Sequence, residues 1–375
     1  MSEKRILIAS LLKPVNDTRM YEKLALSLSK LPDTKVFICG FAGTPPAHAP
    51  ANISFHPLFR FKRLSPGRFT AQLNFLRLLY TLKPDLVIAC THELLWASWI
   101  YCRKYKAKLV YDVQENYTLN LRSQHNYPVP VKRLLAHTIG KIEQFVAPHV
   151  QHFILAEKCY ATELNFTNQK YTVLENKYKK PSGYTSPVTP VRLANAPLRL
   201  LYSGTIAIEY GILEAISLAD KLYTLAPDTS LLIIGYCSNS STWQRVLQSI
   251  ANKPYIRVIG GEQLVPHSQI IEAMQQANVG LLPYLPNPST AGCIPTKLFE
   301  YMAHGLPILI SQNPIWQGIV QEHQAGMSVH FTSINAAEIL DQLRRSEFYT
   351  DGIPNDIFWE TEEAQLLALT EALLA

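Results

Sequence analysis

The chain repeats one pattern, in which a short apolar run of strand length is followed by an amphipathic stretch of helical period. Near-continuous apolar runs between helices are typical of parallel strands that helices cover on both faces. The pattern stops at 177–197, where KYKKPSGYTSPVTPVRLANAP contains four prolines and little periodicity, and it then restarts. This order predicts an α/β fold of two doubly wound, Rossmann-like domains facing a cleft.

The domain boundaries are expected where the pattern breaks. We expect a first domain at 1–178, a linker at 179–197 and a second domain at 198–357. Leucines at 366, 367, 369, 373 and 374 predict a closing helix within 358–375. The runs expected to form strands are Arg5–Leu12, Lys35–Phe41, Ile53–Leu58, Asp85–Thr91, Lys108–Val113, His152–Ala156, Tyr171–Leu174, Arg199–Tyr202, Ser230–Ile234, Arg257–Ile259, Val279–Leu282 and Pro307–Ile310.

The composition excludes several classes of protein. With 375 residues, 47% of them apolar and 17% charged, the chain can fill two cores and is neither disordered nor fibrous. The six cysteines lack metal-binding spacing, so we expect buried thiols in a reducing compartment. The start MSEKRILIASLLK has some features of a signal peptide, but Lys13 closes its apolar run without a cleavage site, which favours a strand. No uninterrupted apolar run approaches the roughly 18 residues that span a bilayer, so we expect a cytoplasmic protein.

Charge is divided unevenly along the chain. Residues 1–180 contain 26 Lys/Arg and 12 Asp/Glu, a net charge of +14, whereas residues 181–375 contain 9 and 17, a net charge of −8. A basic first half favours an anionic partner. Within it, FRFKRLSPGRF at 59–69 interleaves four basic residues with three phenylalanines. That composition fits an anionic membrane interface or single-stranded nucleic acid, with a solvated loop as the alternative.

The stretch IPTKLFEYMAHGLPILIS at 294–311 predicts a short helix followed by a buried strand. Pro295 suits the first helical turn, and Gly305 suits a left-handed stop. The two oxygens of the Glu300 carboxylate can each accept a hydrogen bond from one hydroxyl of a vicinal diol, such as that of ribose. Lys297, three residues earlier on the same face, suits a phosphate near the positive end of the helix. The alternative is a weak surface ion pair between these two side chains.

The same stretch resembles the signature helix of the family 4 (group 1) glycosyltransferases, which have the GT-B fold. Other segments resemble that family in the same order along the chain, namely NDTRMYEKLALSL at 16–28, LVYDVQENY at 109–117, LLYSGTIAIEYGI at 200–212, the Gly260-Gly261 turn and FWETEEAQLLAL at 358–369. The resemblance implies transfer of a sugar with retention of configuration and with no metal or cofactor. It also implies a first domain that binds the acceptor, with the closing helix packed back on it, and a second that binds the donor.

The resemblance assigns the site residues. It implies that Glu300 holds the donor ribose, and it places Asp17, Arg19 and Gln114 on the acceptor side. A helix N-cap is the alternative role for Asp17. The residues expected to bind the donor nucleotide sugar are Gly204, Thr205, Gly261, Gly292, Cys293, Ile294, Lys297 and Glu300.

The sequence departs from the family at four positions. Gly292 stands where the family has a second Glu, Thr205 and Tyr210 stand where it has a phosphate-binding Arg and Lys, and Gln114 replaces an acceptor-side His. Backbone N–H groups of the turn at 203–205, together with the cation of the signature helix, can stabilise a diphosphate without a metal.

We therefore count four residues as candidate catalytic groups. Glu300 and Lys297 act on the donor, and Glu115 and His92 are candidate polar or proton-accepting groups on the acceptor side. His92 follows an expected strand in ACTHELL, so its alternative role is a hydrogen bond to a neighbouring loop.

The sequence thus predicts a retaining glycosyltransferase that moves a sugar from a nucleotide-diphosphate sugar to a glycan or a lipid-diphosphate-linked acceptor, in the synthesis of a cell-surface polysaccharide. We expect peripheral contact with the anionic inner face of a membrane, and no nucleic acid. Two alternatives stay open. One is a binding or scaffold protein that has lost transferase chemistry, and the other is a different enzyme on the same fold, such as an epimerase or a phosphorylase.

Overall fold

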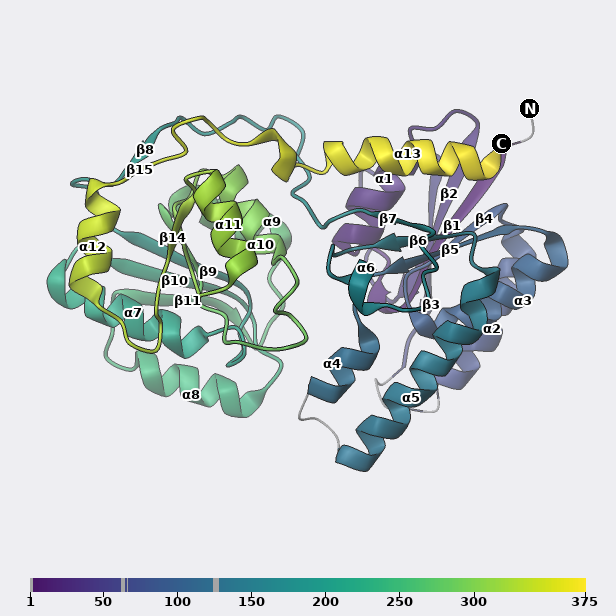
Figure 1. The fold of residues 1–375 in the computed structure, drawn as a ribbon, viewed down its shortest axis with the longest axis horizontal. Coiled ribbons are helices and arrows are strands. Elements are labelled where there is room, and N and C mark those ends of the chain that lie inside the picture. The colour runs from purple at the N-terminus through teal and green to yellow at the C-terminus, as the bar shows by residue number, and fades with distance from the viewer. Residues whose placement is uncertain (1–2, 62–64, 66, 124–127) are drawn as a thin grey trace. The chain divides into compact units, whose positions relative to one another are not determined.

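The structure is a computed structural model that describes residues 3–61, 65, 67–123 and 128–375. The chain divides into two compact units, of which the first comprises Met1–Lys179 with Trp359–Ala375 and the second comprises Lys180–Phe358. Each unit contains a parallel sheet with helices on both faces, as Figure 1 shows. The predicted fold class of two doubly wound, Rossmann-like units is confirmed.

In the first unit the described residues form a seven-stranded sheet of order β3-β2-β1-β4-β5-β6-β7. All of its pairings are parallel. The sheet is wound outward in both directions, so the winding reverses between β1 and β4, where loops can diverge to admit a ligand. Its strands are β1 (Lys4–Pro14), β2 (Thr34–Phe41), β3 (Ile53–Phe59), β4 (Leu86–Ala89), β5 (Lys108–Val113), β6 (His152–Leu155) and β7 (Tyr171–Val173). Its helices are α1 (Leu26–Leu28), α2 (Gly67–Leu82), α3 (Leu95–Tyr105), α4 (Tyr117–Ser123), α5 (Val129–Val146), α6 (Tyr160–Glu163) and α13 (Glu360–Leu374).

The second unit repeats this arrangement with a six-stranded parallel sheet of order β11-β10-β9-β12-β13-β14. The winding reverses between β9 and β12, so the loops after these two strands define a second place for a ligand. Its strands are β8 (Val191–Arg192), β9 (Arg199–Thr205), β10 (Ser230–Tyr236), β11 (Ile256–Gly261), β12 (Val279–Leu282), β13 (Ile308–Ile310), β14 (Gly326–Ser328) and β15 (Glu347–Phe348). Its helices are α7 (Ile212–Leu225), α8 (Ser240–Ile250), α9 (His267–Gln276), α10 (Thr296–Ala303), α11 (Pro314–Glu322) and α12 (Ala336–Arg345).

The segment expected as a linker, 179–197, lies almost wholly within the second unit. Its strand β8 pairs antiparallel with β15, outside the main sheet. The Tyr184 hydroxyl donates a hydrogen bond to the carbonyl oxygen of Ala303 at 2.6 Å. A proline-rich segment without periodicity can thus run along the surface of a folded unit, because side-chain contacts hold it in place of regular structure.

The closing helix α13 returns to the first unit, where Figure 1 shows it beside α1. Trp359 and Leu366 are fully buried in the core that also contains Leu24 and Leu28. The indole N–H of Trp359 donates to the Ser27 hydroxyl oxygen at 2.9 Å. The chain therefore completes the core of its first unit only after the second unit has been traversed.

The basic and aromatic segment 59–69 is only partly an exposed loop. Phe59 is the last residue of β3, and its buried ring packs against Phe75 with centroids 6.4 Å apart. The Phe61 ring packs edge-on against Phe41. Lys62 and Arg63, expected to be part of this basic surface, lie outside the described residues.

Among the residues described, no helix combines the length and the apolar character that crossing a bilayer requires.

Candidate functional site

Helix α10 forms where the sequence predicts it. Pro295 is the N-cap, with the extended φ and ψ of −59° and 133° that favour a helix start. Gly305 follows the helix with a φ of +65°, in the left-handed region that glycine adopts without steric cost. The apolar face of the helix is buried by Leu298, Phe299, Tyr301, Met302 and Ala303.

Tyr301 fixes this helix against the end of β9. Its hydroxyl accepts a hydrogen bond from the Ser203 backbone N–H at 3.1 Å and lies 2.9 Å from the Ser203 hydroxyl oxygen. Its ring fills the space above Gly280 of β12, where an added Cβ would lie 2.4 Å from the ring. The position of α10 is therefore set at the two strands between which the winding of the sheet reverses.

Lys297 and Glu300 meet on the polar face of α10. The Lys297 Nζ donates to Glu300 Oε2 at 2.6 Å, and both side chains are largely buried. Gly204, at the end of β9, has a φ of +109°, and a Cβ there would lie 3.3 Å from the Lys297 Cε. The Lys297 side chain thus lies over the Gly204 turn, and its role toward a diphosphate stays a prediction.

Two histidines flank the Glu300 carboxylate. His267 Nε2, at the start of α9, lies 4.0 Å from Glu300 Oε1. Burial lowers the pKa of His304, an effect that the nearby Glu300 opposes and His267 reinforces. Sequence reasoning missed His267, because it lies on another helix and only its place at the start of α9 could have indicated it.

The loop between β12 and α10 contains three expected donor-binding residues, Gly292, Cys293 and Ile294. The indole N–H of Trp316 donates to the Cys293 carbonyl oxygen at 2.8 Å, and the Asn313 amide donates to the Ala291 carbonyl at 2.9 Å. Ile294 is buried. Hydrogen bonds from α11 and from its N-cap Asn313 therefore hold this loop.

Aromatic side chains line the region where the family has phosphate-binding cations. The Tyr210 ring packs on Tyr284 with centroids 4.8 Å apart, and Tyr284 packs edge-on against Trp316 at 5.6 Å. Thr205 ends β9, and its carbonyl oxygen accepts a hydrogen bond from the Tyr202 hydroxyl at 2.9 Å. The residues at the family's Arg and Lys positions therefore offer rings and hydroxyls in place of positive charge.

Gly261, at the end of β11, is closed in by an indole ring. Its φ is +69°, and a Cβ at this position would lie 2.5 Å from the ring of Trp243 on α8. Only glycine fits such a turn.

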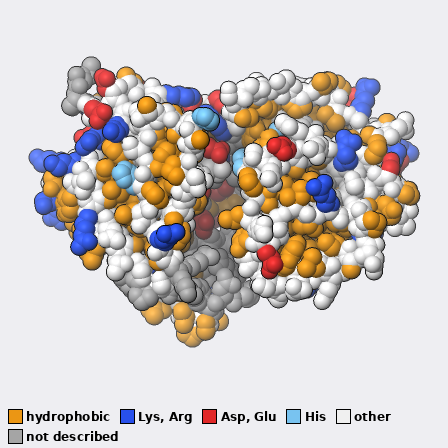
Figure 2. Space-filling view, turned by 180° about the vertical axis from the view of Figure 1, so that it is seen from behind, with side chains coloured by type: hydrophobic (Ala, Val, Ile, Leu, Met, Phe, Trp, Pro, Cys, Tyr) orange, Lys and Arg blue, Asp and Glu red, His pale blue; other side chains and the backbone are white. Residues whose placement is uncertain are grey.

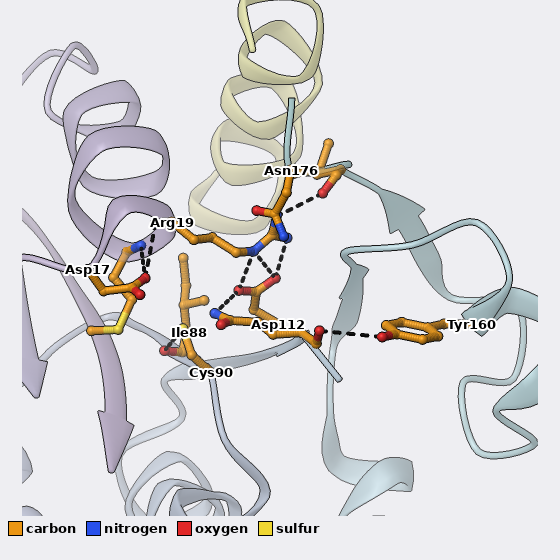
Figure 3. Close-up of polar contacts among 10 residues, drawn as sticks. Asp17, Arg19, Ile88, Cys90, Asp112, Tyr160 and Asn176 are labelled. Carbon is orange, nitrogen blue, oxygen red and sulfur yellow. Dashed lines mark hydrogen bonds and ion pairs between the residues drawn. The ribbon is translucent and has the colours of Figure 1, made fainter. Parts of the chain in front are cut away.

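In the first unit, the expected acceptor-side residue Arg19 points toward Asp112, as Figure 3 shows. The Arg19 guanidinium forms a buried ion pair with the Asp112 carboxylate, with an Nη2-to-Oδ1 distance of 2.7 Å. Its Nη1 also donates to the Leu174 carbonyl and to the Asn176 side chain. Burial alone would lower the pKa of Arg19, but the facing Asp112 raises it. The guanidinium is thus an internal link between the π-helical turn Thr18–Ala25 and the sheet.

The two other acceptor-side residues also make internal contacts. Asp17 is the N-cap of the turn at Thr18–Ala25, and its carboxylate accepts from the backbone N–H groups of Arg19 and Met20. Gln114 donates its amide to Asp112 Oδ2 at 2.7 Å, and its Oε1 is buried without a hydrogen-bond partner among the described residues. The role of these residues toward an acceptor stays a prediction.

His92 lies at the carboxyl end of β4 in a partly buried cluster. Its ring packs on Tyr117 with centroids 4.5 Å apart. Burial lowers its pKa, Glu93 opposes that effect and Arg68 reinforces it. His92 Nδ1 lies 3.5 Å from Glu93 Oε2, and Arg68 forms an ion pair with the same carboxylate at 3.5 Å.

Glu115 is exposed, in contrast to the cluster around His92. Its carboxylate accepts a hydrogen bond from the Asn120 amide at 3.1 Å. Sequence reasoning missed Asp112 and Glu93, and it assigned Arg68 only to the basic segment 59–69. Asp112 lies within the quoted LVYDVQENY and Glu93 within ACTHELL, so the residues were visible but their partners were not.

Comparisons with known proteins bear on the family and on the fold. Residues 191–347 match the family model described as "Glycosyl transferases group 1". No curated protein matches the chain. A sucrose-phosphate synthase from Thermosynechococcus elongatus shares the fold with a TM-score of 0.71 at 14% identity, with 99% of each chain covered.

Two further solved structures share the fold along their whole length. The Anabaena protein Alr3699/HepE in complex with UDP has a TM-score of 0.62 at 13% identity, with coverage of 98% of this chain and 100% of that one. An α,α-trehalose-phosphate synthase (UDP-forming) from Burkholderia vietnamiensis has a TM-score of 0.65 at 13% identity, with coverage of 100% and 99%. The family match over most of the second unit supports a glycosyltransferase, and the fold that the whole chain shares with these structures is the GT-B fold.

Proposed function

We propose that the protein is a retaining glycosyltransferase of family 4 that transfers a sugar from a nucleotide-diphosphate sugar to a glycan or a lipid-diphosphate-linked acceptor. The reaction serves the synthesis of a cell-surface polysaccharide on the cytoplasmic side of a membrane and needs neither a metal ion nor another cofactor. The observation that carries the proposal is the pair of Lys297 and Glu300, whose lysine lies over the Gly204 turn at the reversal point of the second sheet.

The geometry of α10 supports a distinct role for each group. Glu300 Oε1 faces His267 at 4.0 Å while Oε2 accepts from Lys297, so two adjacent ribose hydroxyls can replace these contacts. The freed Lys297 ammonium then faces the diphosphate. The first N–H groups of a helix have no partner within the helix, so those of Thr296 and Lys297 suit the same anion.

Stabilisation of the leaving diphosphate is the main task of this site. Breaking the bond between the anomeric carbon and the diphosphate leaves negative charge on the diphosphate oxygens, which Lys297 and the helix N-terminus offset. The Ser203 N–H is already donated to the Tyr301 hydroxyl, and Gly204 pairs with β10 in the sheet, so the turn contributes through Thr205. The neighbours solved with UDP and with UDP-glucose favour a uridine diphosphate sugar as the first donor to test.

The first unit is proposed to bind the acceptor. His92, whose pKa is lowered by burial, is neutral at physiological pH and can accept a proton, and the exposed Glu115 can bind acceptor hydroxyls. Arg19 and Gln114 shape this region through Asp112, and Asp17 caps the turn that carries Arg19.

A panel of nucleotide diphosphates and nucleotide sugars tests the donor assignment. Binding raises the melting temperature by mass action, and the base that gives the largest shift names the donor class. Glu300→Ala should weaken binding by about 1.5–3 kcal/mol, the range for hydrogen bonds to a charged group. Ser289→Ala, in the neighbouring loop, is the control and should bind as the wild type does. Unchanged affinity of Glu300→Ala for the preferred nucleotide would contradict the ribose role.

A non-catalytic binding protein is the second candidate. The observation that favours it is that Tyr210 and Thr205 stand where the family has phosphate-binding cations, with the Tyr210 ring packed on Tyr284. Nucleotide binding without release of nucleoside diphosphate from any nucleotide sugar, with or without glycan acceptors, would favour this candidate.

A further inference from the structure

The first unit carries an apolar strip on its surface along α5. Val131, Leu134, Leu135 and Phe145 are exposed, with Leu134 at 67% and Phe145 at 50%. These four residues lie within about one third of the helix circumference, since each residue advances the helix by about 100°. Leucine and phenylalanine side chains left in water along one face of a helix indicate a surface that is covered in function.

A neighbouring helix extends the strip with an aromatic side chain. Trp96 on α3 is 48% exposed, and its ring lies 5.3 Å from that of Phe145. We call Trp96, Val131, Leu134, Leu135 and Phe145 the apolar strip. Figure 2 shows hydrophobic side chains gathered at the lower edge of the first unit, where Figure 1 places the start of α5.

A basic row runs beside the strip. Arg133, His137 and Lys141 recur every four residues along α5, so they share one face, and all three are exposed. Helix α3 contributes two further exposed basic residues, Arg103 and Lys104. On these two helices Glu143 is the sole acidic residue, and it is buried. The exposed half of α5 is therefore itself amphipathic, apolar on one side and cationic on the other.

We propose that the apolar strip and its basic row dock the first unit on an anionic lipid bilayer, with α5 lying in the membrane interface. Leucine, valine and phenylalanine enter the boundary between headgroups and acyl chains, while Arg133 and Lys141 contact the anionic headgroups. Trp96 lies at headgroup depth, the position that indole favours. This inference rests on the proposed lipid-linked acceptor, and it moves the membrane contact from the segment 59–69 to α5.

The charge pattern selects a bilayer over a second copy of the chain. Two copies joined face to face through this strip would bring the two basic rows together without acidic partners, which disfavours association. Single-stranded nucleic acid would need aromatic rings along the strip, and α5 offers mainly aliphatic side chains.

Vesicle co-sedimentation of the full-length protein tests the docking. The wild type should pellet with vesicles of phosphatidylglycerol and phosphatidylcholine at low salt and stay in solution with phosphatidylcholine alone. The double variant Leu134→Glu/Leu135→Glu should bind at least tenfold more weakly, which corresponds to about 1.4 kcal/mol. Arg133→Gln/Lys141→Gln should weaken binding and reduce its dependence on salt.

Matched controls come from exposed residues of the second unit. Leu225→Glu/Leu264→Glu makes the same change at leucines that are 50% and 80% exposed, and Arg245→Gln/Arg257→Gln removes the same charge. Both controls should pellet as the wild type does. A wild type that ignores anionic vesicles, or an α5 variant that pellets unchanged, would overturn the proposal. A wild-type dimer that Leu134→Glu/Leu135→Glu converts to monomer, with no vesicle binding, would assign the strip to a second copy.

Two further readouts keep the result independent of folding and of the donor site. Vesicles should shift the tryptophan fluorescence of the wild type to shorter wavelength, and Trp96→Phe should lose much of that shift while it still pellets. A shift that persists in full in Trp96→Phe would place Trp96 away from the lipid and overturn the docking geometry. The nucleotide-induced thermal shift should be the same in every α5 variant, so loss of docking and failure of the proposed donor site are distinguishable.

Discussion

Arg19 and Asp112 show how a charged motif can serve the fold of the first unit. The two groups are nearly inaccessible to water, and Arg19 also donates to the Leu174 carbonyl and to Asn176. One guanidinium thus connects the turn after β1 with β5 and with the chain after β7. A buried pair of this kind is costly to break on one side, because the remaining charge is left without an opposite charge.

Replacing one member of this pair should therefore destabilise the first unit more than replacing both. We expect Arg19→Met to lower the free energy of unfolding by about 3–5 kcal/mol, the usual cost of an unpaired buried charge. Arg19→Met/Asp112→Leu should recover much of that loss. The measurement is chemical denaturation of the wild type, both single variants and the double variant. Equal losses in Arg19→Met and in the double variant would contradict a dominant role for the uncompensated carboxylate.

At the residue scale, the sequence indicated which side chains matter better than it indicated what they contact. The spacing of Lys297 and Glu300 placed them on one helix face, because three residues is a local distance. The contact between Arg19 and Asp112 joins residues 93 positions apart. Such a contact depends on the register of the sheet, which periodicity alone does not give.

At the scale of elements, α5 is attached to the sheet through a buried carboxyl group. The Tyr111 hydroxyl on β5 donates to Glu143 Oε1 at 2.8 Å. Burial raises the pKa of Glu143 to about 7, although the bond from Tyr111 acts in the opposite direction. The carboxyl group is thus half protonated near neutral pH in the folded protein, whereas in the unfolded chain it ionises near its ordinary value.

This difference makes the stability of the first unit depend on pH. Because the folded pKa of Glu143 is raised, the folded state holds the proton more tightly, and stability falls as pH rises from about 4.5 to 7. Glu143→Gln keeps an acceptor for Tyr111 without ionising. We expect the variant to be about 1–3 kcal/mol more stable than the wild type at pH 8 and close to it at pH 5.

Denaturant titrations of both proteins at pH 5, 6, 7 and 8 measure this difference. Comparing variant with wild type at each pH cancels the titration of the other groups. Glu163→Gln on α6 is the control, since its carboxylate accepts a hydrogen bond from the Asn116 amide and lies outside α5. A Glu143→Gln variant that tracks the wild type at every pH would show that Glu143 ionises normally.

The elements themselves were largely predictable, and the exceptions have a physical reason. Strands β2, β5 and β12 have the predicted bounds to within a residue, and α13 lies within its predicted range. The apolar pattern of each of these segments fits only one type of secondary structure. The apolar residues of α5 are different. Sequence shows that Leu134 and Phe145 are apolar, but only the fold shows that the opposite face of the helix meets the sheet.

At the scale of the whole molecule, the net charge of each unit differs from that of the corresponding half of the sequence, because the last helix belongs to the first unit. The first unit as folded has 25 Lys/Arg and 16 Asp/Glu, because α13 brings four glutamates to it. Its net charge is therefore +9, and that of the second unit is −3. Three of these glutamates pair with lysines of the first unit, Lys177 with Glu362, Lys30 with Glu363 and Lys179 with Glu360 and Glu363. The acidic start of α13 is thus complementary to the basic surface that receives it.

The return of α13 should make the stability of the first unit depend on the last residues of the chain. Trp359 is fully buried, and its backbone N–H donates to the Tyr178 carbonyl oxygen at 2.8 Å. We expect Trp359→Ala to lower the free energy of unfolding of the first unit by about 3–5 kcal/mol, the usual cost of removing a buried tryptophan. Trp359→Phe should cost less stability than Trp359→Ala, because it keeps a buried ring. It should still cost some, because it loses the hydrogen bond to Ser27.

Differential scanning calorimetry can assign this loss to one unit. A nucleotide diphosphate that binds the second unit raises the unfolding temperature of that unit by mass action. The transition that moves with added nucleotide is therefore that of the second unit, and we call it the labelled transition. The transition that the nucleotide does not raise should move to lower temperature in Trp359→Ala, while the labelled one stays in place, because each unit has its own sheet and core. If the labelled transition moved instead, the closing helix would stabilise the donor-binding unit. The chain would then depend on its last residues for the donor site and not for the core into which Trp359 packs.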